Sequence, residues 1–215
     1  DQLIKNFSLE RIQKGGAIMY PIILCSIIAF AIILERLYYL RRIKIDTIAF
    51  MNNIEGALKH NKVAEAVKIC EDTEGPIAAI VKAGILKYDR PRQEMREAIE
   101  DAGHQEVHGL EKHVKILATI AHISPLLGLL GTVTGMIKAF QVIQVKTSAL
   151  NPVGTGDLAG GILQALLTTA AGLIVAVPAI VAYHYLEAKV HDFVFEMERS
   201  ATELINIMSQ RIEGY

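Results

Sequence analysis

The sequence lacks the patterns that mark enzymes and nucleic-acid-binding proteins. It contains no glycine-rich phosphate loop, no dinucleotide-binding fingerprint and no catalytic-triad motif. Its formal net charge is −1, so it has no excess of positive charge for binding DNA or RNA. We therefore expect neither catalytic residues nor a nucleic-acid partner.

Cysteine is scarce, and patterns typical of β-structure are missing. Cys25 falls in an uncharged run and Cys70 in a polar segment, so we expect no disulfide between them. Neither cysteine has the spacing of a metal ligand. The alternating polar and apolar segments of a membrane β-barrel are also absent, which favours an all-helical fold.

Two histidines, His104 and His108, lie four residues apart in the sequence HQEVH. This is not the zinc-protease pattern, in which a glutamate directly follows the first histidine. Glu106, Glu111 and His113 are close enough in sequence to complete a metal site. A charged, solvated helix face explains the same residues more simply, and we expect no metal here.

Three long uncharged segments dominate the rest of the sequence, at 15–34, 116–137 and 158–186. Each has at least the roughly 20 residues that a helix needs to cross a bilayer. The first is not typical of a cleaved signal peptide, because Glu35, Arg36 and two tyrosines follow it in place of small residues. The sequence therefore predicts an all-α integral membrane protein with three transmembrane helices.

The positive charges predict the orientation of these helices. Arg36, Arg41 and Arg42 follow the first run, Lys115 precedes the second, and Lys189 follows the third. By the positive-inside rule these flanks face the cytoplasm. The predicted order is an outer N-terminal segment 1–14, a helix at 15–34, a cytoplasmic helical domain 35–115, a helix at 116–137, an outer connector 138–157, a helix at 158–186 and a cytoplasmic helix 187–215.

Capping residues and periodicity predict helices in the cytoplasmic parts. We expect Asp46 to cap a helix ending near His60, and Asn61 to cap another ending near Asp72. No strong helix breaker separates Pro91 from the second run, which predicts one long helix through the membrane boundary. The near-heptad spacing of Phe193, Met197, Leu204 and Ile207 predicts that the third membrane helix likewise continues to the C-terminal region.

The second and third runs carry small residues at helical spacings, namely Gly128, Gly131 and Gly135 in the second and Gly161, Ala165 and Gly172 in the third. Small residues allow membrane helices to approach closely. We expect these two helices to pack together, with Thr132 and Thr169 beside the groove. Alternatively, each threonine hydroxyl only bonds a carbonyl of its own helix. The first helix should lie outermost, with its isoleucine and leucine side chains, from Ile22 to Ile32, facing lipid.

Further polar residues lie inside the runs. Gln164 and Thr168 share another face of the third helix, and His122 is titratable within the second. Polar and ionisable residues inside a membrane are candidates for an ion path. For His122, hydrogen bonding to neighbouring groups is the simpler explanation.

Three segments carry a resemblance to a known family. They are ATIAHISPLLGLLGTVTGMIKAF at 118–140, GDLAGGILQALLTTAAGLIVAVPAIVAYHYL at 156–186 and the shorter IILERLYYLRR at 32–42. They resemble the three-span ExbB/TolQ branch of the ExbB/TolQ/MotA proton-channel family. The resemblance implies a motor subunit of the bacterial inner membrane, with a periplasmic N-terminus and a cytoplasmic C-terminus. H⁺ flow would drive TonB-dependent uptake or the Tol–Pal system. The flagellar stator branch, with four spans, fits less well.

The resemblance also implies partners. Five copies would surround two copies of an ExbD/TolR-like protein whose single span bears an aspartate, and the motion would pass to a TonB-like protein. Thr132 and Thr169 match the family threonines that face this partner. No cofactor is implied beyond the transported ion.

One position departs from the family. Gln164 stands where the branch commonly has glutamate, and glutamine cannot titrate. The pathway would then depend on the partner's aspartate alone, or carry Na⁺, for which amide and hydroxyl oxygens are suitable ligands. A non-conducting scaffold, in which the small-residue grooves only pack, is the alternative from another functional class.

Overall fold

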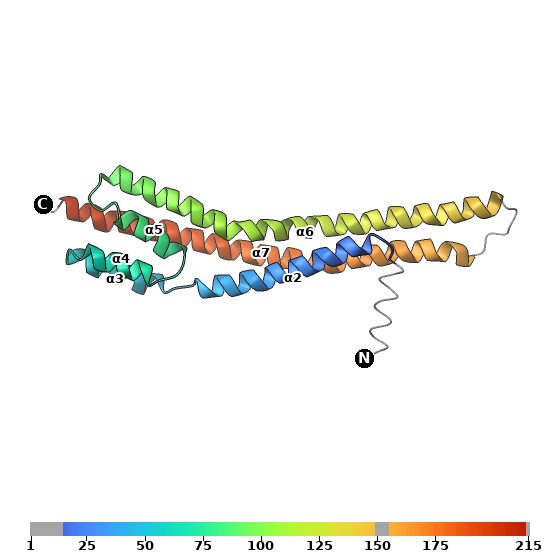
Figure 1. Ribbon diagram of the computed structural model, residues 1–215, viewed down its shortest axis with the longest axis horizontal. Helices are drawn as coiled ribbons and strands as arrows, with labels where there is room; N and C mark the ends of the chain where they lie inside the picture. The colour runs from blue at the N-terminus through green and yellow to red at the C-terminus, as the bar shows by residue number, and fades with distance from the viewer. Residues whose placement is uncertain (1–14, 149–154, 214–215) are drawn as a thin grey trace, which may run out of the picture. The chain divides into compact units, whose positions relative to one another are not determined.

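The computed structural model describes residues 15–148 and 155–213, which form six helices and no strands (Figure 1). The helices are α2 (Met19–Arg42), α3 (Thr47–Lys59), α4 (Val63–Glu71), α5 (Pro76–Ile85), α6 (Arg92–Ser148) and α7 (Thr155–Glu213). The predicted all-α fold is confirmed.

Three of these helices are long and apolar enough to cross a membrane: α2, α6 over Arg92–Lys146, and α7 over Leu158–Ser209. They contain the second and third uncharged runs and residues 19–34 of the first, which was predicted to be helical from 15, so the chain is a multi-pass membrane protein. As predicted, α6 and α7 continue far beyond their apolar parts. The predicted segment 1–14 lies outside the described residues. Most of the predicted connector 138–157 is helical, and only 149–154 between α6 and α7 are not described.

The chain divides into two compact units. The membrane unit contains the described residues of 15–34 and 115–184, and the helical unit contains those of 35–114 and 185–213. Each unit therefore combines a segment that precedes α6 in the sequence with part of α6 and part of α7.

In the membrane unit, α2 presents an apolar face outward. Leu24, Ile27 and Phe30 are exposed, as a lipid-facing helix requires. Ile22, which was expected to face lipid, is instead buried at 1% exposure. The expectation for this residue was wrong because one side of α2 packs inside the unit, and Ile22 and Ala29 lie on that side.

In the helical unit, the first predicted cap is confirmed and the second is wrong. The Asp46 carboxylate accepts a hydrogen bond from the backbone N–H of Ala49 at 3.1 Å and begins α3. Asn61 does not cap α4, because the N-cap residue is Lys62. Asn61 has a φ of 62°, a left-handed conformation that asparagine tolerates better than most residues. It therefore belongs to the turn that leaves α3.

Three helices of the helical unit meet at Gly84 of α5. A Cβ atom there would lie 2.6 Å from Leu204 of α7 and 2.8 Å from Ile99 of α6. Met197 and Leu204, two of the four residues at near-heptad spacing, are buried, so this part of α7 is a core helix.

Candidate ion-pathway site

In the membrane unit, α6 and α7 approach each other along a seam of small residues. A Cβ atom at Gly135 would lie 2.6 Å from the carbonyl oxygen of Gly161 and 2.9 Å from Cβ of Ala165. One at Gly172 would lie 2.6 Å from the carbonyl oxygen of Ser124. Real Cβ atoms essentially never come within 3.0 Å of such groups. This helix separation therefore requires glycine.

The contacts along the seam define an antiparallel register, and the two helices run side by side in this part of Figure 1. The facing pairs are Ser124 with Gly172, Gly128 with Thr169, Gly131 with Thr168, and Gly135 with Gly161 and Ala165. The structure thus places all six small residues noted in the sequence, Gly128, Gly131, Gly135, Gly161, Ala165 and Gly172, at the seam.

The three threonines use their hydroxyl groups differently. Thr169 Oγ1 donates across the seam to the Gly128 carbonyl oxygen at 3.0 Å. Thr132 Oγ1 donates to Leu129 of its own helix at 2.6 Å. Thr168 Oγ1 lies 3.0 Å from two carbonyl oxygens of its own helix. Bonding within one helix therefore describes Thr132 and Thr168, but not Thr169.

Burial separates these threonines further. Thr132 and Thr169 are half-buried, which places them at the edge of the seam. Thr168 is 0% exposed and lies against Gly131. The structure therefore places Thr168 inside the α6–α7 interface and not on the surface of the membrane unit.

Gln164 is 9% exposed and is held from two sides. Its Oε1 accepts a hydrogen bond from Lys138 Nζ at 3.1 Å. On the other side lies Gly16, where an added Cβ would overlap the Gln164 carboxamide. Gly16 has a φ of +71°, a conformation that also favours glycine.

Sequence reasoning did not connect Lys138 or Gly16 with Gln164. One signal was present for Lys138, which is the first charged residue after the second uncharged run. Its distance of 26 positions from Gln164 hides the contact, since only the antiparallel register brings the two side chains together.

His122 lies on the surface of the membrane unit, away from the seam. Its Nδ1 is 2.7 Å from the Ala118 carbonyl oxygen one turn earlier, the geometry of a ring N–H donating within the helix. The structure does not bring His122 together with Gln164 or the threonines.

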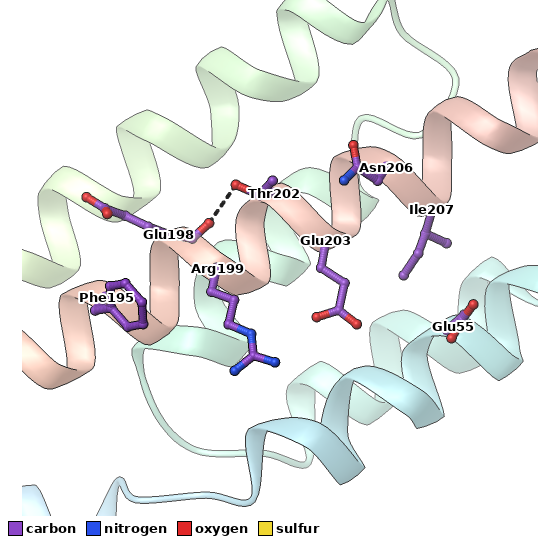
Figure 2. A pocket seen from close by; sticks show the side chains of 8 residues that line it. All are labelled: Glu55, Phe195, Glu198, Arg199, Thr202, Glu203, Asn206 and Ile207. Atoms are coloured by element: carbon purple, nitrogen blue, oxygen red, sulfur yellow. Dashed lines mark hydrogen bonds between the residues drawn. The ribbon is translucent and has the colours of Figure 1, made fainter.

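The helical unit contains no comparable candidate. Among the described residues, no three His, Cys, Asp or Glu side chains gather as metal ligands. A hollow of about 540 Å³ lies on α7 (Figure 2), lined by Glu55, Phe195, Glu198, Arg199, Thr202, Glu203, Asn206 and Ile207. The Thr202 hydroxyl donates to the Glu198 carbonyl oxygen at 2.9 Å. This open, acidic groove shows no arrangement typical of catalysis.

Comparison with known proteins identifies the seam helices as part of a described family. The family model for the MotA/TolQ/ExbB proton channel family matches residues 72–199, which is more than half of the chain. The chain belongs to this family. The matched residues include all of α6, α7 as far as residue 199, and the polar residues of the seam region, Thr132, Lys138, Gln164, Thr168 and Thr169.

Curated relatives support the ExbB/TolQ branch of the MotA/TolQ/ExbB family. The biopolymer transport protein exbB1 of Vibrio cholerae is 32% identical over 184 residues, covering 80% of this chain and 76% of that protein. The Tol-Pal system protein TolQ of Haemophilus influenzae is 30% identical over 201 residues, covering 88% and 86%. An ExbB homolog of Methanothermobacter thermautotrophicus is 29% identical over 191 residues, and the match spans 88% of this chain but only 66% of that protein.

Proposed function

We propose that this chain is an ExbB/TolQ-like subunit of an ion-driven motor in the bacterial inner membrane. Five copies surround two copies of an ExbD/TolR-like partner whose single span carries an aspartate. Proton flow past that aspartate moves the partner relative to the pentamer. The motion drives an envelope process such as TonB-dependent uptake or the Tol–Pal system.

The observation that carries this proposal is the seam of polar hydroxyls between helices whose uncharged runs, 116–137 and 158–186, contain no acidic residue. Asp157 is the only acidic residue in 15–34, 115–148 and 155–184. A carboxyl group that carries protons through the span must therefore come from another chain. The half-buried side chains of Thr132 and Thr169 offer polar contacts to such a group, at positions that match the family's partner-facing threonines.

The surface of the membrane unit supports assembly in a bilayer. Large apolar side chains are exposed on all three of its helices, among them Leu24, Leu126, Val133 and Ile174. Water would make this exposure costly, whereas lipid or a second copy of the chain covers it. The charge distribution favours a periplasmic N-terminus and a cytoplasmic C-terminus.

Co-purification with the candidate partner, followed by mass measurement of the intact complex, tests the assembly. The expected result is five copies of this chain with two of the partner. A stable monomer in detergent, or a complex of this chain that never contains a single-span protein with an intramembrane aspartate, contradicts the proposal.

Ion flux tests the motor against its two alternatives. A proton-driven motor works without sodium and stops when a protonophore is added. A sodium-driven motor requires Na⁺ and resists a protonophore while the membrane potential is held. A scaffold assembles with its partner but supports no partner-dependent flux of either ion.

A further inference from the structure

We infer that Lys138 determines the ion specificity of this pathway, because its ammonium group occupies the Gln164 oxygen at which Na⁺ would bind. This inference deepens the proposed function and rests on it. Lys138 is not among the residues that the sequence analysis assigned to the ion pathway, which are Thr132, Gln164, Thr168 and Thr169.

The Gln164 carboxamide has little freedom to offer its oxygen elsewhere. Its Oε1 accepts the hydrogen bond from Lys138 Nζ at 3.1 Å, and the residue is 9% exposed. Gly16 closes the opposite side, since even a Cβ atom there would overlap the carboxamide. The oxygen therefore stays directed at Lys138.

While Lys138 holds the Gln164 oxygen, the neighbouring hydroxyl oxygens do not by themselves form a cation site. Thr168 Oγ1 is the nearest candidate on α7, but it is fully buried, faces Gly131 and donates within its own helix. Thr169 donates to Gly128 on the opposite helix. Hard cations need several oxygen ligands at once. With Lys138 in place, a sodium ion would gain one shared oxygen and meet a like charge.

The ammonium group of Lys138 also places a fixed positive charge beside the Gln164 oxygen. This group donates to a neutral amide oxygen, and Asp157 is the only acidic residue in 15–34, 115–148 and 155–184. A positive charge bonded to this oxygen repels a second cation that approaches it. A proton can still reach a partner carboxyl group, because proton transfer does not require the Gln164 oxygen as a ligand.

The test compares wild type, Lys138→Met and Lys138→Arg, each in complex with the partner in proteoliposomes. Proton flux is measured with Na⁺ or with K⁺ at equal ionic strength. We expect wild type and Lys138→Arg to show the same flux in both salts. In Lys138→Met, Na⁺ should bind the released Gln164 oxygen, with water oxygens as its further ligands, and reduce proton flux several-fold. Lys146→Met is the matched control, since it removes another lysine of α6, eight positions further along the chain.

A second measurement does not depend on flux. Ions that bind the native state raise the unfolding temperature, so the detergent-solubilised oligomer of this chain is heated in Na⁺ and in K⁺. Only Lys138→Met should unfold at a higher temperature in Na⁺, and adding Gln164→Ala to that variant should abolish the difference. If Lys138→Met does not assemble, Lys138→Gln removes the charge while keeping a hydrogen-bond donor.

The outcomes separate the inference from the proposed function. A Na⁺ effect in Lys138→Met, in either measurement and absent from wild type and Lys138→Arg, supports the role of Lys138. Its absence from both measurements, or a Na⁺ requirement in the wild type, overturns it. A wild-type complex without flux of any ion contradicts the proposed motor. The unfolding temperatures then still show whether Lys138 keeps Na⁺ from the Gln164 oxygen.

Discussion

The Thr169 hydroxyl donates a hydrogen bond to the Gly128 carbonyl oxygen on the opposite helix, at 3.0 Å. The backbones are so close here that a Cβ atom on Gly128 would lie 3.1 Å from Thr169 Cα. Of the two alternatives that the sequence left open, Thr169 therefore follows the one in which it lies beside the groove, because its hydroxyl does not bond only its own helix. It belongs to the close-packed seam, and it places a polar oxygen at the edge of that seam.

Replacing Thr132 and Thr169 by valine tests whether their hydroxyl groups serve ion transfer. Valine keeps the volume and removes the hydroxyl, and a hydrogen bond within a membrane contributes only about 0.6 kcal/mol on average. We expect the double variant to assemble normally, as judged by intact mass, while partner-dependent ion flux falls sharply. Ser124→Ala, which removes another hydroxyl that bonds within α6, serves as the control. Full flux in the double variant would return both threonines to a packing role.

Two adjacent glycines of α7 should respond oppositely to alanine. A Cβ at Gly161 would lie 2.7 Å from the Gly135 carbonyl oxygen and 2.9 Å from Ala139 Cβ, whereas nothing lies within 4 Å of one at Gly160. We expect Gly161→Ala to destabilise the chain by about 1–3 kcal/mol, typical of overpacking. Gly160→Ala should be neutral, or stabilising by up to about 1 kcal/mol through helix propensity.

Thermal unfolding of both glycine variants in detergent provides the comparison. Equal unfolding temperatures for Gly160→Ala and Gly161→Ala would show that the α6–α7 separation is not set by this contact.

Burial raises the pKa of the Cys70 thiol from 9.0 to about 11, while nearby Lys82 lowers it and Glu71 raises it by smaller amounts. The folded state therefore binds this proton more tightly than the unfolded state. Its contribution to stability is complete below pH 9 and is lost as the pH rises toward 11. The free energy of unfolding should fall over this range more steeply in wild type than in Cys70→Ala. Identical pH profiles for the two proteins would contradict this.

The orientation of the chain can be tested with single cysteines in a Cys25→Ala, Cys70→Ala background. Val145 lies near the end of α6 and Lys87 lies just after α5, and both are exposed. An impermeant thiol reagent should label Val145→Cys in intact cells and Lys87→Cys only after permeabilisation. Labelling in the reverse order would overturn the charge argument for topology.

Much of the fold could be read from the sequence because its signals are local. Uncharged runs reveal the membrane helices, and the lack of breakers after Pro91 reveals the length of α6. Asp46 was recognisable as a cap because a cap bonds within three residues. Asn61 was misread because its side-chain type suits both a cap and a left-handed turn, and the path of the chain after α3 decides between them.

The candidate site depends on contacts between residues far apart in the sequence, and the tertiary structure decided which residues meet there. The sequence by itself determined that two helices rich in small residues would pack closely, because glycine spacing is a property of each helix. Only the antiparallel register of α6 and α7 decided that Thr169 bonds across the seam, that Thr168 is buried and that Gln164 meets Lys138 and Gly16. A hydroxyl or an amide has the same sequence signal in each of these positions. The role of such a group depends on which backbone or side-chain atoms of the neighbouring helix lie next to it. The spacing of residues within one helix does not reveal those neighbours.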